Sequence, residues 1–442
     1  MRIGRVACMT ALAAVATYSV AMAGVASAAT APGTSGAGSA SEFARVCPPV
    51  ATPGVASCNA IQLLNPAANW KGVQVPAKGP NKGHGGGGGT TTSFPGYTAP
   101  NLQAAYNLSE ASAALGGGET VAVVDAYDDP NAAADLAVYR NKMGLPSLCG
   151  AALTPTTSCS GSFTKENQSG AQNSPPTAST SWSEEISLDL DMVSAICPNC
   201  NILLVEATSS TISDLAAAEG TALAGTGVDA VSNSYGGSES QTTEHTYNSA
   251  YSSNTAAITV SAGDSGYGVE FPAAAPSVVA VGGTTLTSDS PSMAAGSWSQ
   301  TVWSGTGSGC SAFESIPSWQ PSTSLCAKRT VADVAADANP STGVAVYDTF
   351  GESGWLVFGG TSVASPIVAS VFALAGYSGT SSAAAEGLYT GASVLTKVTS
   401  GSNARHCSDY LCNAADSLGQ SSKDPGYNGP TGNGTPNGLS GF

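Results

Sequence analysis

Residues 201–233, NILLVEATSSTISDLAAAEGTALAGTGVDAVSN, contain the pattern that decides the fold. The run Asn201–Glu206 has the length and composition of a strand, Ser213–Ala224 has the composition of a helix, and Val228–Asn233 is a second short apolar run. Because a helix separates two strands that are apolar on both faces, we expect the strands to lie parallel in a buried sheet.

The same alternation continues in both directions. Further strands are expected at Thr120–Asp125, Ala256–Ser261, Val278–Val281 and Gly343–Tyr347, and helices at Asn131–Lys142, Ser183–Ile196, Glu244–Ser252 and after Ser362, over Ile367–Gly376. The sequence therefore predicts a three-layer α/β fold, in which helices flank a mostly parallel central sheet. Active sites of such folds lie at the carboxyl ends of the strands.

Composition narrows the class of protein. The chain has 442 residues, of which 42% are hydrophobic and 10% charged, so it has enough apolar residues to build a core. It carries 14 Lys and Arg against 30 Asp and Glu, a net charge of −16. A nucleic-acid partner, which requires a basic face, is therefore not expected.

The N-terminus has the features of an export signal. Met1–Arg5 carries two positive charges, an apolar stretch runs from Val6 to Val25, and Ala26–Ala28 provides small residues for cleavage. A membrane anchor is the alternative, but polar residues interrupt the stretch and no other run could span a bilayer. We expect residues 1–28 to be a signal peptide and 29–98 an extension with a Gly-rich linker. The mature protein is then secreted, extracellular and free of the membrane.

The cysteines agree with export. Cys8 lies in the signal, and the other ten form five close pairs: Cys47/Cys58, Cys149/Cys159, Cys197/Cys200, Cys310/Cys326 and Cys407/Cys412. In an exported protein such pairs indicate disulfides. The spacing of Cys197 and Cys200 also suits zinc, but one such motif without a second is weak evidence for a metal site.

Gly359–Pro366, GGTSVASP, opens a helix of small residues and contains a candidate nucleophile. A serine held in a sharp turn at the positive end of a helix has an exposed, activated hydroxyl, so Ser362 suits nucleophilic catalysis. Alternatively it is only a helix cap. The histidines His84, His245 and His406 stand in no catalytic motif, which argues against a Ser-His-Asp mechanism.

Glu185 and Asp189 are the candidate base. They are four residues apart in Trp182–Asp191, so a helix places them on one face. Two carboxyl groups held close share a proton and titrate together, which suits a general base in acid. The alternative is a solvated acidic helix face.

The order E-x-x-x-D, then Ser261–Gly266 (SAGDSG), then G-T-S-x-x-x-P resembles the sedolisin family of serine-carboxyl peptidases, and similarity extends over about Pro100–Phe442. The resemblance implies a subtilisin-like fold over residues 99–442. It also implies a catalytic set of Ser362, Glu185, Asp189 and Asp264, in which Asp264 is protonated and donates a hydrogen bond to the oxyanion. It also implies that Ser234, Tyr235 and Gly236 bind substrate. The expected function is an acid-active endopeptidase on polypeptide substrates, monomeric by default.

Several positions depart from the family. Asp125 replaces a Glu that extends the catalytic network, and Tyr235 replaces a usual Trp. Lys397 and Asn428 stand where two calcium-binding aspartates are expected, so we expect no calcium, no other cofactor, and the Lys397 ammonium in the ion's place. Residues 30–95 are too short and irregular for the family's long pro-domain.

Other functions are less well supported. A catalytically weak homologue that binds peptides or acts as a secreted scaffold remains the main alternative. An ester or polysaccharide hydrolase would need a G-x-S-x-G elbow with a histidine partner, which is absent. Gly263–Gly266 also mimics the chymotrypsin-type nucleophile segment at Ser265, but that family requires an all-β fold and an upstream histidine.

Overall fold

The computed structural model describes residues 42–72, 95–153, 158–290, 296–418 and 426–442. The predicted signal peptide at 1–28 and the glycine tract at 85–89 lie outside these ranges. Residues Ser41–Phe442 form one compact unit. None of the described helices combines the length and the apolar character that crossing a bilayer requires.

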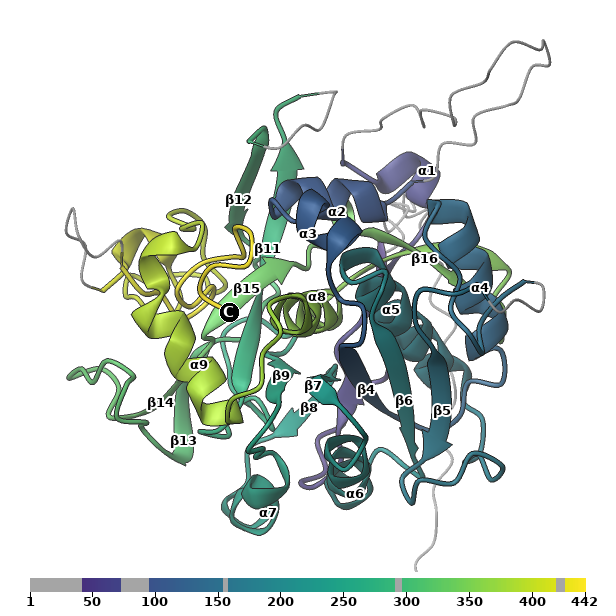
Figure 1. The fold of residues 1–442 in the computed structure, drawn as a ribbon. Coiled ribbons are helices and arrows are strands. Elements are labelled where there is room, and N and C mark those ends of the chain that lie inside the picture. Colours follow the sequence, from purple (N-terminus) through teal and green to yellow (C-terminus); the bar gives the residue numbers. More distant parts are fainter. Residues whose placement is uncertain (1–41, 73–94, 154–157, 291–295, 419–425) are drawn as a thin grey trace, which may run out of the picture. The chain divides into compact units, whose positions relative to one another are not determined.

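A large, mostly parallel sheet forms the centre of this unit (Figure 1). The strand order is β12-β11-β9-β7-β4-β6-β5, with β15 also paired to β11, and within this sheet only the β11–β12 pair is antiparallel. The strands are β4 Thr120–Ala126, β5 Phe163–Asn167, β6 Asn201–Ala207, β7 Val228–Asn233, β9 Ala257–Ser261, β11 Val279–Ser288, β12 Trp298–Val302 and β15 Val334–Asp337. The predicted three-layer α/β fold is confirmed.

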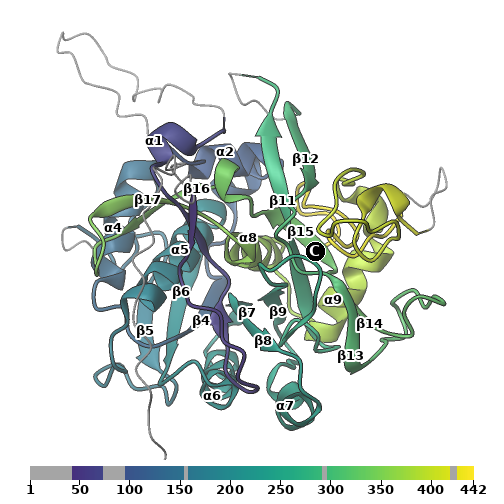
Figure 2. The same ribbon diagram turned by 180° about the vertical axis from the view of Figure 1, so that it is seen from behind.

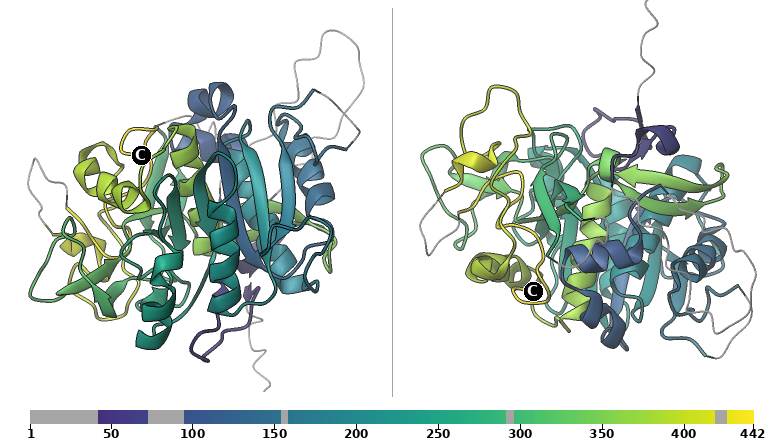
Figure 3. Two further views of the ribbon diagram at one scale, coloured as in Figure 1. Left: turned by 60° about the horizontal axis from the view of Figure 1, so that its bottom comes forward. Right: turned by 90° about the horizontal axis from the view of Figure 1, so that it is seen from above.

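Helices cover both faces of the sheet (Figure 3). The helices α5 Thr180–Ile196 and α8 Thr361–Leu374 pack against each other and against the sheet, while α6 Ile212–Leu223 covers the other face. Nearly every residue of α5 and all of α8 are buried, which fits the apolar composition of α8, whereas α5 also buries acidic residues. The remaining helices are α1 Pro66–Asn69, α2 Ala99–Ala105, α3 Ser109–Ala114, α4 Ala132–Met143, α7 Gln241–Tyr247 and α9 Ser381–Thr390, with 3₁₀ turns at Asn248–Ala250, Pro340–Thr342, Ala392–Val394 and Ala414–Asp416.

Three smaller sheets complete the fold, and two of them contain strands from the N-terminal extension. The first has the order β1-β3-β17-β16 and the second β10-β8-β2, both antiparallel, while β13 pairs with β14. Figure 2 shows the N-terminal strands in purple, running between the regions of β17 and β8. The bounds are β1 Phe43–Arg45, β2 Ser57–Cys58, β3 Ile61–Leu63, β8 Tyr235–Ser238, β10 Glu270–Phe271, β13 Gly309–Ser315, β14 Lys328–Val331, β16 Val344–Asp348 and β17 Gly354–Gly359.

Some expected elements differ from the structure. The run Gly343–Tyr347 forms β16, which lies in an antiparallel side sheet because it folds back on β17. The helix expected at Glu244–Ser252 is α7, which starts at Gln241 and gives way to a 3₁₀ turn at Asn248. The small-residue helix begins at Thr361, so that Ser362 lies in its first turn.

The structure joins the cysteines in the five predicted pairs. Cys197 and Cys200 are bonded to each other, so their sulfur atoms are not free to bind zinc. The Cys47–Cys58 bridge closes a loop of the N-terminal extension.

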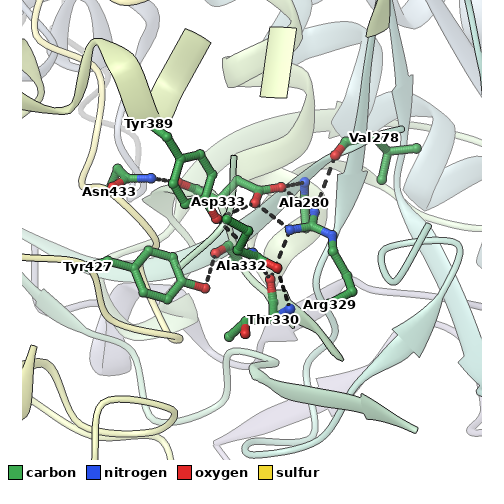
Figure 4. A network of polar contacts seen from close by, with 10 residues as sticks. Val278, Ala280, Arg329, Thr330, Ala332, Asp333, Tyr389, Tyr427 and Asn433 are labelled. Atoms are coloured by element: carbon green, nitrogen blue, oxygen red, sulfur yellow. Dashed lines mark hydrogen bonds and ion pairs between the residues drawn. The ribbon is translucent and has the colours of Figure 1, made fainter. Parts of the chain in front are cut away.

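A buried ion pair anchors the C-terminal part of the chain (Figure 4). Arg329 donates to both oxygens of Asp333, at 2.6 and 2.5 Å, and both side chains are fully buried. Asp333 also accepts from the N–H of Ala280 on β11 and from the Tyr389 hydroxyl on α9, each at 2.8 Å. This network ties β11 and α9 to the segment that leads into β15.

Candidate active site

The turn before α8 determines where Ser362 lies. Gly360 has a φ of 101°, which favours glycine, and Ser362 follows in the first turn of the helix. Pro366 lacks the N–H that would bond the Ser362 carbonyl within the helix. The Ser234 hydroxyl donates to that carbonyl at 3.4 Å, so a neighbouring segment completes the turn.

Glu185 and Asp189 approach Ser362 from α5. Both carboxyl groups are fully buried, and Ser234 donates to Asp189 Oδ1 at 2.8 Å. Neither oxygen of Glu185 makes a hydrogen bond of good geometry within the described residues, and the Ser362 hydroxyl donates to the Ser234 carbonyl at 3.3 Å. The Ser362 hydroxyl nevertheless lies close enough to favour the ionised form of Glu185. The buried pair excludes a solvated acidic face.

Burial is the main cause of the raised pKa values of Glu185 and Asp189. It raises the pKa of Glu185 well above its ordinary value, and the charges of Asp189 and Asp125 raise it further. Burial likewise raises the pKa of Asp189, while the Ser234 hydrogen bond opposes the rise. Because these carboxyl groups interact, they share protons rather than titrating one by one.

Asp125 adds a third carboxylic acid to the pair of Glu185 and Asp189. It ends the apolar run of β4 and is fully buried with both oxygens unpartnered among the described residues, and its pKa is raised by burial and by the charges of Asp189 and Glu206. Glu206 lies opposite Asp125 on β6 and contacts Lys165 at 3.2 Å. A chain of four carboxyl groups therefore runs from Ser362 toward a lysine, and Glu206 is a member that the sequence analysis missed.

Asp264 lies on the other side of Ser362, after β9. Its Oδ1 accepts from the Thr361 N–H at 2.7 Å and from the Thr361 hydroxyl at 2.9 Å, whereas the buried Oδ2 has no hydrogen-bond partner among the described residues. Burial raises the pKa of Asp264 to about 7, against the lowering effect of Thr361. The free oxygen can therefore carry a proton in acid and donate it in a hydrogen bond.

The expected substrate-binding residues lie on β7–β8, and their roles differ. Ser234 contacts both Asp189 and Ser362, and Gly236 exposes its backbone to a pairing strand. The Tyr235 side chain points into the core, where its hydroxyl donates to Asn233 at 2.6 Å and lies 3.3 Å from the Tyr251 hydroxyl. The backbone of Tyr235, and not its ring, pairs with Cys58 on β2.

The histidines lie elsewhere. His245 and His406 are exposed, whereas Ser362 is fully buried, and His84 lies outside the described residues. Within the described residues, the acidic groups near the serine are thus carboxyl groups and not imidazoles.

The calcium positions implied by the fold family do not fit a cation. Lys397 donates to the Asn433 carbonyl at 2.6 Å, and the Asn428 amide donates to the Val398 carbonyl at 3.2 Å. Backbone carbonyls that could bind an ion therefore accept from an ammonium and an amide N–H, and two anionic oxygens are missing.

Sequence reasoning missed residues of the N-terminal extension that contact the site. Asn59 accepts from the Ser362 N–H at 3.0 Å, and Arg45 donates to the Asp264 carbonyl at 2.8 Å. No local motif identifies these residues, since both contacts join distant parts of the chain.

The site thus combines a serine at the start of a buried helix with flanking buried carboxyl groups in an α/β fold. Comparison with solved structures agrees on the fold: Pseudomonas sedolisin, a serine-carboxyl proteinase complexed with two molecules of pseudo-iodotyrostatin, superposes with a TM-score of 0.62 at 23% identity, covering 77% of this chain and 95% of that one.

Curated sequences are similar to part of the chain. The chain is 40% identical over 119 residues to sedolisin of Pseudomonas sp. (strain 101), and 36% identical both to xanthomonalisin of Xanthomonas sp. (strain T-22), over 126 residues, and to kumamolisin of Bacillus sp. (strain MN-32), over 139. These matches cover 24, 24 and 26% of this chain, and 19, 14 and 24% of the relatives. No protein-family model matches. The chain is thus similar to sedolisins over about a quarter of its own length, and it spans less than a quarter of the length of these curated relatives.

Proposed function

We propose that the protein is an acid-active endopeptidase that cleaves polypeptides with Ser362 as nucleophile. The observation that carries the proposal is the burial of Ser362 at the start of α8 beside Glu185, with carboxyl groups where a histidine would otherwise be needed. Ser362 attacks the peptide carbonyl while Glu185 takes its proton, and Asp189 positions Glu185 through their shared proton. Protonated Asp264 and the Ser362 N–H stabilise the oxyanion.

Two protonation requirements set the pH range. Asp264 donates a hydrogen bond only while protonated, so activity falls as the pH rises through about 7, the pKa of Asp264. At the acid end, activity falls when the group of Glu185, Asp189 and Asp125 loses its last negative charge. The enzyme therefore works in acid, where its pI of about 4.4 also leaves it with little net charge.

The site of action is proposed to be outside the cell. The export features of residues 1–28 and the five disulfides support this location.

The test follows digestion of denatured casein from about pH 3 to pH 8. Activity should peak in acid and be lost in Ser362→Ala and Glu185→Gln. Ser370→Ala is the matched control, because Ser370 is a buried serine of the same helix whose hydroxyl has no partner among the described residues. A folded wild-type chain that is inactive at every pH would contradict the proposal and favour a secreted peptide-binding protein.

A further inference from the structure

Glu206 lies at the far end of the four buried carboxyl groups that begin beside Ser362. It belongs to β6, which has β4 on one side and the edge strand β5 on the other (Figure 1). Asp125 is its register partner on the parallel strand β4, so both side chains lie on the same face of the sheet. On β5, the Lys165 ammonium lies 3.2 Å from Glu206 Oε1. Glu206 therefore stands between an inner carboxyl group and a cation at the edge of the sheet.

The two oxygens of Glu206 have different surroundings. Oε1 accepts from the Asp129 N–H at 3.0 Å and contacts the Lys165 ammonium, whereas the buried Oε2 has no hydrogen-bond partner in the part of the chain that the structure describes. Burial raises the pKa of Glu206 to about 8, although Lys165 opposes the rise, so this group is protonated in acid. Because Oε1 is already an acceptor of two hydrogen bonds, the proton of Glu206 lies on Oε2.

Asp189 shows the same asymmetry nearer the nucleophile. Its Oδ1 accepts from the Ser234 hydroxyl at 2.8 Å, and its buried Oδ2 has no partner among the residues described. Burial raises the pKa of Asp189, so its proton in acid lies on Oδ2. Between Glu206 and Asp189 lies Asp125, whose pKa is raised by burial and then by the charges of these two neighbours. The fixed acceptors thus leave one oxygen each, on Glu206 and on Asp189, to donate to a neighbouring carboxyl group.

The charged groups around Glu206 allow it to stay neutral. Lys165 forms an ion pair with Asp128, and its ammonium also donates to the Asp129 carbonyl at 2.8 Å. Besides burial, the charge of Asp128 raises the pKa of Glu206. The Asp129 side chain accepts from the Ser187 hydroxyl of α5 at 3.4 Å, and burial raises its pKa to about 7. Because Asp128 is the counter-ion of Lys165, Glu206 does not have to ionise beside the ammonium.

At the inner end, Glu185 has carboxyl groups as its charged neighbours. After burial itself, Asp189 and Asp125 raise its pKa, and Asp264 beyond β9 adds a smaller rise, whereas the Ser362 hydroxyl lowers it. A carboxylate at Glu185 therefore depends on hydrogen-bond donors for its stability.

We propose that Glu206 is a positioning residue of the peptidase reaction, which sets the direction of the hydrogen bonds along the buried carboxyl groups. The proposal rests on the peptidase function proposed above. The Oε2–H of Glu206 donates to Asp125, and Asp125 donates in turn to Asp189. Asp189 donates to Glu185, which is left as the single carboxylate of the row and accepts the proton of Ser362. The outer end of the row thus holds the negative charge at the inner end, where the reaction needs it.

The experiment compares kcat and KM of the full chain on a peptide substrate from about pH 3 to pH 8. Glu206→Met fills the space of the side chain but removes the donor, so the pKa of the carboxylate at Glu185 rises. We expect the acid limit of activity to move about one pH unit higher, which lowers kcat about tenfold on the acid side of the profile. KM should change little, because Glu206 is fully buried and offers no surface to a peptide.

Two further variants test the direction of the hydrogen bonds. In Glu206→Gln, the amide oxygen can accept from the Asp129 N–H while the amide nitrogen donates toward Asp125, so the acid limit should match that of the wild type. Lys165→Met removes the nearby cation from a side chain that is 26% exposed, and it should also move the acid limit to higher pH. This variant carries the test if Glu206→Met does not fold.

Glu219→Met is the matched control. Glu219 is also fully buried and burial raises its pKa to about 8, but it belongs to α6, which covers the opposite face of the sheet. The variant removes a buried carboxyl group of the same kind and should leave the acid limit unchanged.

The contrary outcomes are distinct. If folded Glu206→Met keeps the wild-type acid limit, the positioning role is overturned and the peptidase function stands. The same conclusion holds if Glu206→Gln shifts the limit as far as Glu206→Met does, or if Glu219→Met shifts it equally. If the wild type cleaves neither the peptide nor casein at any pH, the peptidase function fails, and the positioning role with it.

Discussion

The backbone N–H of Ser362 donates a hydrogen bond to the carbonyl oxygen of Asn59, although the two residues lie far apart in the sequence. A helix N-terminus with free N–H groups attracts an oxygen that carries negative charge. Here that position is taken by a carbonyl of the protein itself. Any other peptide that binds to Ser362 must therefore displace Asn59.

Asp264→Asn tests the protonated carboxyl group. The asparagine keeps an acceptor for Thr361 and supplies a permanent N–H where Asp264 Oδ2 lies, so it removes the titration without removing the donor. Because burial raises the pKa of Asp264 to about 7, the wild type should lose activity above that pH. We expect the variant to be less active than wild type at pH 4 and more active at pH 8, as measured by kcat/KM on a peptide substrate. Identical pH profiles would rule out Asp264 as the group that sets the alkaline limit.

Ser234→Ala tests how Asp189 positions Glu185. The Ser234 hydrogen bond lowers the pKa of Asp189, so its loss should raise that pKa and move the acid limit of activity to higher pH. It also leaves the Ser362 carbonyl without its side-chain partner. We expect kcat to fall on the order of tenfold while KM changes little. The comparison is with Ser370→Ala, whose pH profile should match the wild type.

Stability should fall as the pH rises. Burial raises the pKa of Glu219 to about 8 and that of Glu184 and Glu206 to about 8 as well. The folded state then holds more protons than the unfolded state between about pH 4.5 and pH 8, so the free energy of unfolding decreases over this interval. This stabilisation is fully present below the unfolded pKa values and is lost as the pH passes the folded ones.

Glu219→Gln isolates one contribution. Glu219 is fully buried and its oxygens have no hydrogen-bond partner of good geometry within the described residues. At pH 8 the variant should melt several degrees above the wild type, while at pH 4 the two should be similar. Glu110→Gln, at an exposed position on α3, is the control and should not change the melting temperature at either pH. A wild-type melting temperature that is constant from pH 4 to pH 8 would contradict the argument.

The Arg329–Asp333 pair should be essential for folding. Asp333→Asn leaves the fully buried guanidinium without its charge partner, which costs about 3–5 kcal/mol of unfolding free energy. Arg329→Met/Asp333→Leu removes both charges and should be less destabilising than the single change. Urea denaturation at pH 5 measures both values. A double variant that is less stable than Asp333→Asn would show that the network stabilises by more than charge pairing.

Calcium should not stabilise the wild-type protein. The Lys397 ammonium and the Asn428 amide already donate to carbonyls of the expected site. Lys397→Asp/Asn428→Asp supplies two carboxylates and removes the cation, so its melting temperature should rise with added calcium. A rise in the wild type at millimolar calcium would refute the substitution of a metal by Lys397.

The sequence predicts the central sheet and the proximity of Glu185 and Asp189 because both depend on local patterns. The alternation around 201–233 requires parallel strands, and the four-residue spacing of Glu185 and Asp189 places both on one face of α5. The sequence does not predict the orientation of the Tyr235 ring, because the ring turns toward Tyr251 through a contact between separate segments.

The N-terminal extension could not be placed from its sequence. Its strands have two or three residues each, too few for a periodic pattern, and they form only because β8 and β17 offer hydrogen-bonding partners. For the same reason the sequence predicts a strand at Gly343–Tyr347 but not its pairing with β17, because an apolar run indicates a strand and not its neighbour.

The position of β2 and β3 has a consequence for solubility. Each covers an edge of a side sheet, β2 on β8 and β3 on β17. An uncovered sheet edge presents a row of free N–H and C=O groups to which strands of other molecules can add. Displacement of β2 and β3 would therefore expose two unpaired sheet edges at once, and the protein in that state should need either bound peptide or dilution to avoid self-association.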